Sequence, residues 1–353
     1  MEVRSMDSRI SLDPVAAGVC TLLTSYLRLS AGNRLLVRVT SKEGGESRIP
    51  PQLRQVALEL GIALTVEVLA DNAPFDGAEL PAFDALLYAG INKSKHRNEL
   101  KEALKDGLET PCYRLFDLSP EVFALCFNMQ QSHMAELNLK IIEAARSAKI
   151  IKIRSRNGTD LSIRPDAQAD WTSSYGWFDG TYPGVLPPGE VNSYSEAIDG
   201  TLVVDGAINT NFAFDADPCL HGPQVRLHIG NGRVTGIESS NATVMAICET
   251  LFSMENGNRI GEIGFGTNEG IGQLVDFRSH INERLAGFHI GVGSPIQKNP
   301  YITWTCPLHI DFILASASIW FDDRLVFSNQ RWIRTALPAD THGVVPDLYA
   351  DTV

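Results

Sequence analysis

The sequence predicts an α/β N-terminal domain with a mostly parallel sheet over residues 1–150, followed by a β-rich α+β domain over residues 151–353. Two observations predict this division. Up to about residue 150, strand-like runs alternate with helical segments, and this alternation requires crossover connections between parallel strands. Beyond that point, two Asn-Gly pairs lie between strand-like runs, and Asn-Gly is a strong hairpin signal.

The elements of the first domain are defined by apolar periodicity and by their end signals. Pro51 and Gly61 bound one amphipathic segment in the manner of a helix start and a helix end. Short apolar runs before and after it alternate as strands do. The expected elements are a strand at 33–40, a helix at 51–60, strands at 62–69 and 83–89, and helices at 98–105, from Ser119 onward and at 133–148.

The second domain is expected to consist mainly of antiparallel strands. Asn157-Gly158 lies between the runs 150–154 and 161–164, and Asn231-Gly232 lies between 225–229 and 234–237. Further strands are expected at 200–206, 287–293 and 308–314, and one helix at 242–252. The glycine-rich segment 264–270 does not fit a dinucleotide-binding motif, and we interpret it as a turn.

Composition narrows the class of protein without naming a function. The net charge of -12 argues against nucleic acid as a partner, because phosphate contacts need a basic face. The sequence contains no run of about 18 apolar residues, the length that would predict a membrane span. The N-terminus lacks signal-peptide features, so we expect a cytoplasmic protein. The six cysteines are scattered and are expected to be free, mostly buried thiols.

His309-Ile310-Asp311 is the first candidate for a functional site. It lies in a strand-like run, and side chains two residues apart on a strand point to the same face. An imidazole and a carboxylate therefore project together and can hold one cation. A buried histidine hydrogen-bonded to an aspartate would have the same pattern, so the pair alone leaves both interpretations open.

Three further residues can complete a metal site. His289 lies in an apolar, glycine-bounded stretch, Glu262 is a lone charge in an apolar run, and Glu190 follows Pro-Pro-Gly. Burial of Glu262 would be costly without a partner. With His309 and Asp311 they provide three carboxylates and two imidazoles, enough for two metal ions that share a bridging water.

Five short segments resemble, in the same order, motifs of the aminopeptidase T-type metallopeptidases. They are Asn157–Leu161, Gly189–Val191 with Ile198–Leu202, Gly261–Asn268, Phe288–Gly293 and His309–Phe312. The resemblance implies a metal-dependent hydrolase of a small-molecule or short-peptide substrate, in a homo-oligomer. It also implies two divalent ions (Zn, Mn or Co) with the ligands Glu190, Glu262, His289, His309 and Asp311.

The same resemblance suggests two catalytic residues. Family members carry a glutamate shortly before the first histidine as the candidate general base, and Glu283 lies in that region. They also carry a tyrosine seven residues after that histidine, where this chain has Ile296. Tyr301 is the candidate to replace the missing tyrosine.

Two alternatives remain beside the hydrolase. The chain also resembles 2,5-dihydroxypyridine 5,6-dioxygenase, a mononuclear non-haem Fe(II) enzyme, and His289, His309 and Asp311 could supply a two-histidine, one-carboxylate triad for iron. The second alternative is a non-catalytic relative that keeps the fold and binds a partner.

Overall fold

The computed structural model describes residues 13–40, 47, 49–70, 80–89, 95–180, 182–210, 217–222, 224–276, 279–297 and 301–341. The chain divides into two units, Met1–Met134 with Ser174–Pro188, and Ala135–Ser173 with Gly189–Val353. Residues 174–188 thus return to the first unit, although the predicted domain 151–353 contains them. The division into two folding domains near residue 150 stays a prediction.

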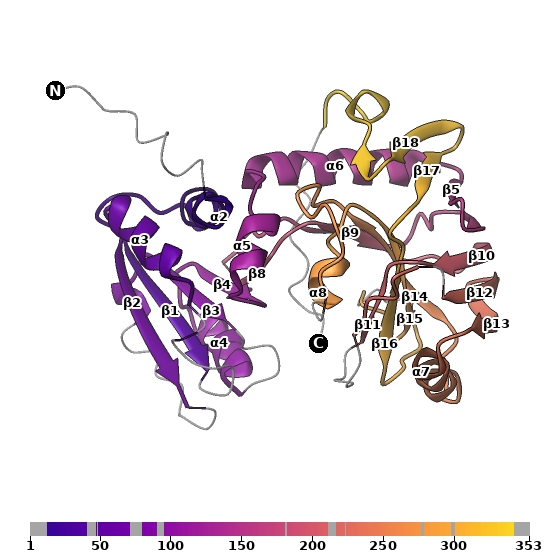
Figure 1. The fold of residues 1–353 in the computed structure, drawn as a ribbon, viewed down its shortest axis with the longest axis horizontal. Helices are drawn as coiled ribbons and strands as arrows, with labels where there is room; N and C mark the ends of the chain where they lie inside the picture. The colour runs from indigo at the N-terminus through magenta and orange to yellow at the C-terminus, as the bar shows by residue number, and fades with distance from the viewer. Residues whose placement is uncertain are drawn as a thin grey trace. The chain divides into compact units, whose positions relative to one another are not determined.

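The first unit contains a five-stranded parallel sheet in the order β2-β1-β3-β4-β8 (Figure 1). This confirms the parallel sheet that alternating strands and helices predict. The strands are β1 (Arg34–Thr40), β2 (Ala63–Leu69), β3 (Ala85–Ala89), β4 (Cys112–Leu115) and β8 (Gly184–Leu186). The helices are α2 (Pro14–Thr21), η1 (Leu22–Tyr26), α3 (Pro51–Glu59), η4 (Leu80–Ala82), α4 (Lys95–Lys105) and α5 (Pro120–Cys126).

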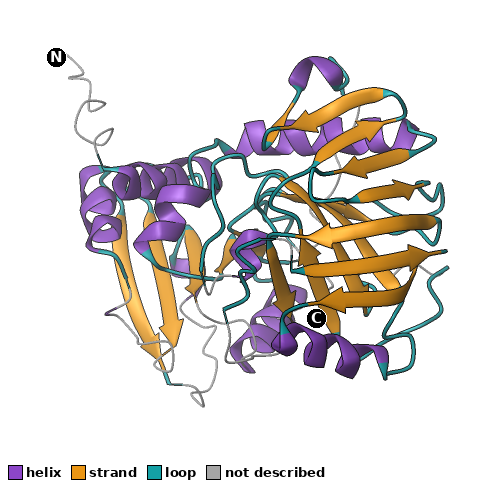
Figure 2. Cartoon of the chain, turned by 45° about the vertical axis from the view of Figure 1, so that its right-hand side comes forward, coloured by secondary structure: helices purple, strands orange, loops and turns teal. Residues whose placement is uncertain are grey.

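The second unit contains two sheets whose registered strand pairs are antiparallel (Figure 2). One sheet has the order β13-β12-β10-β6-β5-β17-β18-β19. Its strands are β5 (Ile151–Arg154), β6 (Asp160–Ile163), β10 (Ile198–Val204), β12 (Val225–Gly230), β13 (Arg233–Ser239), β17 (Ser318–Phe321), β18 (Arg324–Ser328) and β19 (Arg331–Trp332). Both predicted Asn-Gly hairpins, β5–β6 and β12–β13, are confirmed.

The other sheet has six strands in the order β11-β16-β15-β14-β9-β7. They are β7 (Thr172–Ser174), β9 (Glu190–Ser193), β11 (Ala207–Thr210), β14 (Ile260–Gly266), β15 (Gly287–Gly293) and β16 (His309–Ile313). The interpretation of residues 264–270 as a turn is wrong for the first three, because residues 264–266 pair with both β15 and β9. The remaining helices are α6 (Gln131–Ser147), α7 (Ala242–Phe252), α8 (Ser279–Asn282) and η5 (Arg334–Ala336).

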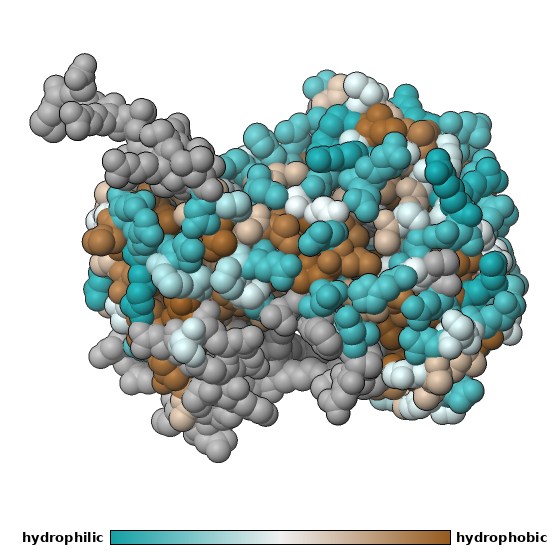
Figure 3. Space-filling view, in the orientation of Figure 1, coloured by the Kyte–Doolittle hydropathy of each residue, from teal (hydrophilic) through white to brown (hydrophobic). Residues whose placement is uncertain are grey.

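The core of the second unit lies against one face of the six-stranded sheet. Phe265 of β14 is fully buried, stacks on Trp171 at a centroid distance of 6.2 Å, and packs edge-on against Phe321. Apolar residues of α6, including Leu137 and Ile141, belong to the same core. On the face drawn in Figure 3, hydrophilic residues cover much of this unit's surface. Among the described residues, no helix has the length and apolarity needed to cross a membrane.

Candidate metal centre

The five predicted metal ligands lie on one face of the six-stranded sheet. In β14 the apolar side chains of Ile263 and Phe265 alternate with Glu262, and side chains alternate between the two faces of a strand. The strand register places the remaining ligands on the same face as Glu262, across β9, β15 and β16. One face of the sheet is therefore apolar and packed into the core, and the other holds carboxylates and imidazoles.

Two glycines make room for the two imidazole rings. Gly264 pairs with His289, and a Cβ at position 264 would lie 1.9 Å from His289 Nε2. A Cβ at Gly291 would lie 2.4 Å from His309 Cε1. Real side chains do not approach so closely, so each ring lies in space that any other residue would fill. The glycines of β14 and β15 thus form the floor of the site.

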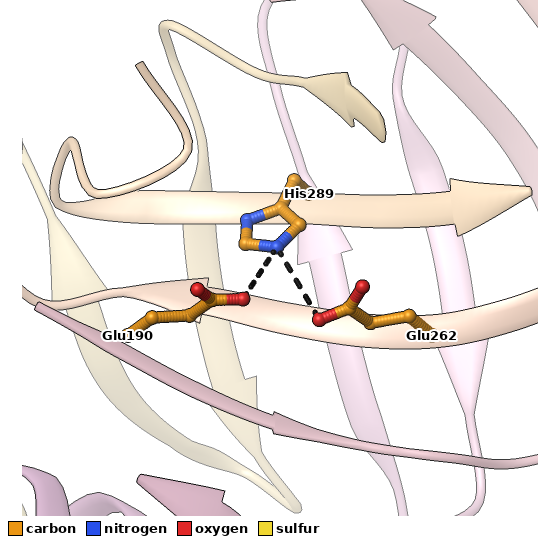
Figure 4. Close-up of side chains that lie close together, drawn as sticks. All are labelled: Glu190, Glu262 and His289. Atoms are coloured by element: carbon orange, nitrogen blue, oxygen red, sulfur yellow. Dashed lines mark ion pairs between the residues drawn. The ribbon is translucent and has the colours of Figure 1, made fainter. Parts of the chain in front are cut away.

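Glu190, Glu262 and His289 form the first group of donors. His289 Nε2 lies 3.3 Å from Glu190 Oε1 and 3.9 Å from Glu262 Oε1. Figure 4 shows the two carboxylates directed at the same ring nitrogen. All three residues are at most 2% exposed. Their ligand atoms lie within 4.8 Å of one another, close enough for one ion to contact all three.

Glu262, His309 and Asp311 form the second group, again within 4.8 Å. His309 Nε2 lies 2.8 Å from Asp311 Oδ1 and 3.2 Å from Glu262 Oε2. Glu262 belongs to both groups and offers a different oxygen to each. The predicted residues are therefore brought together in the pattern expected of two neighbouring cation sites with a shared carboxylate.

The surroundings of His309 favour a positive charge in the second group. His309 Nδ1 lies 2.7 Å from the carbonyl oxygen of Ser294, so Nδ1 must carry a hydrogen and donate it. In a neutral ring, Nε2 would then present a lone pair to two carboxylates. Burial alone would lower the pKa of His309, but the charge of Asp311 and hydrogen bonds to Asp311 and Glu262 raise it well above its usual value. The two carboxylates therefore favour a positive charge at Nε2, and a metal ion would supply one.

Glu262 supports the same conclusion. Burial alone would raise the pKa of Glu262, but the nearby imidazoles of His289 and His309 lower it to about 2. Its Oε1 is buried and accepts no hydrogen bond from the described residues. A buried carboxylate oxygen without a partner is costly, and a divalent ion would satisfy it. The donors therefore fit a divalent cation, with a backbone carbonyl orienting one imidazole as is common in metal sites.

Glu283, the candidate general base, lies beside this cluster. Asn209 of β11 donates through Nδ2 to Glu283 Oε2 at 2.5 Å and to Asp311 Oδ2 at 3.2 Å. Burial and the negative charge of Asp311 raise the pKa of Glu283 well above its usual value. Arg284 Nη1 contacts Glu283 Oε1 at 2.8 Å and also pairs with Glu190 Oε2.

Tyr301, the candidate to replace the family tyrosine, differs from the metal ligands in its exposure to solvent. Tyr301 exposes 65% of its surface, whereas the donor residues are buried or nearly so, and Ile296 is half-buried. This exposure does not favour Tyr301 as the replacement for the family tyrosine. Its catalytic role stays a prediction.

A third group of possible metal donors lies away from the predicted residues. Asp217, His221 and Asp276 have ligand atoms within 4.8 Å of one another, but His221 and Asp276 are exposed. Exposed acidic groups of this kind are common without an ion. This group is relevant to metal counting, because a surface ion could be counted with those of the buried centre.

A mixed α/β fold with a buried carboxylate and imidazole cluster on a strand face defines a candidate metal-binding protein. The solved structures that share this fold include two with low sequence identity to this chain. One is 2,5-dihydroxypyridine dioxygenase from Pseudomonas putida KT2440, with a TM-score of 0.58 and 17% identity over 91% of this chain and 97% of that chain. The other is wild-type AmpT from Thermus thermophilus, with a TM-score of 0.56 and 14% identity over 91% of this chain and 99% of that chain.

These two likenesses support a distant relationship, as the sequence resemblances led us to expect. A family model described as "Crocagin biosynthetic protein CgnE/B" matches residues 219–322. That match contains Glu262, Glu283, His289, His309 and Asp311 and leaves out Glu190. No curated protein matches the chain.

Several residues of the cluster are not assigned a role by the sequence motifs. Arg284 is adjacent to the candidate base but has no motif of its own, and Gly264 falls in the segment interpreted as a turn. Asn209, which joins Glu283 to Asp311, carries no signal because it lies far from both in the sequence. The sequence signal that points to these residues is the alternation of glycines around Glu262 and His289. A strand face without side chains leaves space that residues of the adjacent strands must occupy.

Proposed function

We propose that the protein is a divalent-metal-dependent hydrolase that acts on an amide bond of a small peptide or modified amino acid. The observation that carries the proposal is the position of Glu262. Its two oxygens face two different histidines, and each histidine has a further carboxylate beside it. This arrangement suits a hydrolytic metal centre better than a structural hydrogen-bond pair, which needs only one carboxylate.

The donor types support the same choice of chemistry. Carboxylates and imidazoles suit Zn, Mn or Co, and the centre offers three carboxylates to two imidazoles. A bound divalent ion lowers the pKa of its water to about 7 and polarises a carbonyl oxygen. The remaining steps fall to the chain's own residues.

Glu283 is the candidate for proton transfer. It is nearly buried beside Asp311 and is held by the amide of Asn209. Because burial and Asp311 raise its pKa, its carboxylate can accept a proton at a pH closer to neutral than an ordinary glutamate can. The amide of Asn209 also contacts Asp311, so the candidate base and the second donor group share one hydrogen-bond donor.

The mononuclear iron alternative has less support from the geometry. A facial triad would need His289, His309 and Asp311 around one ion. Among the described residues these three do not form a group within 4.8 Å, whereas the two groups that contain Glu262 do. The fold alone does not decide, because the structural neighbours include both a dioxygenase and the aminopeptidase AmpT.

Metal analysis and a His309→Ala variant test the proposal. Elemental analysis of protein purified without chelator should find Zn, Mn or Co, and His309→Ala should lose both the ion and amide hydrolysis. Full hydrolysis by metal-free His309→Ala would refute the proposal. An iron-loaded protein whose activity stops without O₂ would favour the dioxygenase. A protein that binds no metal and gains no activity when metal is added would favour a non-catalytic relative.

A further inference from the structure

Arg284 places a permanent positive charge inside the metal centre. It is 1% exposed, and its Nη1 pairs with Glu190 Oε2 and lies 2.8 Å from Glu283 Oε1. Arginine is rarely buried without a partner, and its guanidinium does not lose its proton in proteins. Two of the cluster's carboxylates are therefore already neutralised in part by the chain itself.

Both carboxylate oxygens of Glu190 are already bound by hydrogen-bond donors of the chain. Its Oε2 is bound by Arg284, and its Oε1 accepts a hydrogen bond from Asn192 Nδ2 at 3.3 Å. Glu262 differs, because its Oε1 is buried without a hydrogen-bond donor among the described residues. The two carboxylates occupy equivalent places beside His289, but only Glu262 lacks a protein donor at one oxygen.

Arg284 brings its single positive charge to the Glu190 side of the centre, where its Nη1 pairs with Glu190 Oε2 and lies 2.8 Å from Glu283 Oε1. No arginine or lysine is paired with Glu262 or Asp311 among the ion pairs of the described residues, so these two carboxylates are the ones left for a divalent ion. A second ion between Glu190 and His289 would lie beside the guanidinium that already binds Glu190. Like charges in a buried site repel strongly, because little water screens them.

We propose that Arg284 replaces the second metal ion, so that the centre holds one exchangeable divalent ion through Glu262, His309 and Asp311, with Glu190 as the partner of Arg284. Arg284 is then a positioning residue that acts through Glu190 and Glu283. The inference rests on the proposed function in that it assumes a metal-binding centre. The inference differs from the proposed function in the number of ions and in the role of Glu190.

Counting Mn²⁺ ions tests the inference. Metal-free protein is dialysed to equilibrium against a series of Mn²⁺ concentrations, and the bound ion is measured by elemental analysis. The parent protein of this experiment and all variants carry His221→Ala, which removes the surface group Asp217–His221–Asp276 from the count. We expect one bound equivalent, with any second ion bound about 100-fold or more weakly, because like-charge contact costs several kcal/mol.

Two variants locate the ion relative to Arg284. Glu190→Gln should keep its one equivalent, with an affinity within about threefold of the parent, because Asn192 and Arg284 rather than an ion satisfy Glu190. Arg284→Met removes the guanidinium and should gain a second equivalent. The double variant Arg284→Met/Glu190→Gln should lose that second equivalent again. Far-UV circular dichroism shows whether each variant is folded.

The outcomes separate the inference from the proposed function. Two equivalents of similar affinity in the parent protein, or loss of the ion in Glu190→Gln, would overturn the role of Arg284 and leave the metal hydrolase intact. No bound ion in the parent would overturn both. If Arg284→Met does not fold, the parent titration and Glu190→Gln still decide between one ion and two.

Discussion

Replacing Gly264 by alanine tests whether the glycine floor of the site is required to hold a metal. The new Cβ would lie 1.9 Å from His289 Nε2, 2.3 Å from Cε1 and 2.5 Å from Cδ2. The ring has little space to retreat into, because His289 is 2% exposed and Gly264 lies on a strand that pairs on both sides. We expect the imidazole to rotate away from Glu190 and Glu262, or the two strands to separate locally.

The magnitude follows from these contacts. Forcing an extra methyl group into a packed interior costs about 1–3 kcal/mol. In a domain of this size each kcal/mol lowers the melting temperature by about 2–4 °C. Displacing His289 should also weaken metal binding by about 10–100-fold, the usual effect of disturbing residues that orient a ligand.

Thermal unfolding and Mn²⁺ binding of Gly264→Ala measure both effects. Gly230→Ala is the matched control, because Gly230 also lies in a strand of the second unit but a Cβ there meets only Thr235 Cγ2, at 3.6 Å. The control should melt close to the parent protein and bind metal with the parent affinity. If Gly264→Ala behaves like Gly230→Ala in both assays, the placement of His289 against β14 is wrong.

Three further predictions concern the same unit and the thiols. A chelator should lower the melting temperature of the protein, because it removes a metal ion that binds only the folded state. A free ligand at 100 times its dissociation constant stabilises the folded state by about 2.7 kcal/mol. An unchanged melting curve would count against a metal centre. Gly291→Ala should weaken metal binding like Gly264→Ala, since its Cβ would lie 2.4 Å from His309 Cε1, and unaltered binding would contradict this. Burial raises the pKa of Cys112 and of Cys248 to about 12, so both thiols stay protonated at pH 8 and should react with a thiol reagent only after unfolding. Rapid labelling of either cysteine in the folded protein would refute their burial.

Much of the fold follows from local sequence signals. The strands at 34–40 and 63–69 alternate clearly, and the two Asn-Gly hairpins are fixed by turn chemistry. Strand β8 carries no such signal, because three residues are too few to show a period. Its place at the edge of the parallel sheet depends on pairing with β4, a contact between segments about 70 residues apart in the sequence, which no local pattern encodes.

The candidate site is predictable in part for a similar reason. His309 and Asp311 are two residues apart on one strand, so their shared face follows from strand geometry. Glu190 and Glu262 meet His289 only because β9, β14 and β15 are neighbours in the sheet. The sequence indicates that relation through the order of family motifs. It does not show that the chain supplies Arg284 as a cation beside Glu190.

Strand β14 shows which physical signal in the sequence points to the site. All seven of its residues are buried, yet residues 262, 264 and 266 on one face are a glutamate and two glycines. A fully buried strand face without apolar side chains leaves a space that the next strand must fill. On β15, His289 is the residue opposite Gly264, and it fills the space with a ring that carries a metal-binding nitrogen. Above Gly266 the backbone of Leu285 fills the space instead. A lone buried carboxylate with a glycine two residues later therefore predicts a large side chain on the neighbouring strand, and in this chain that side chain is the imidazole of His289.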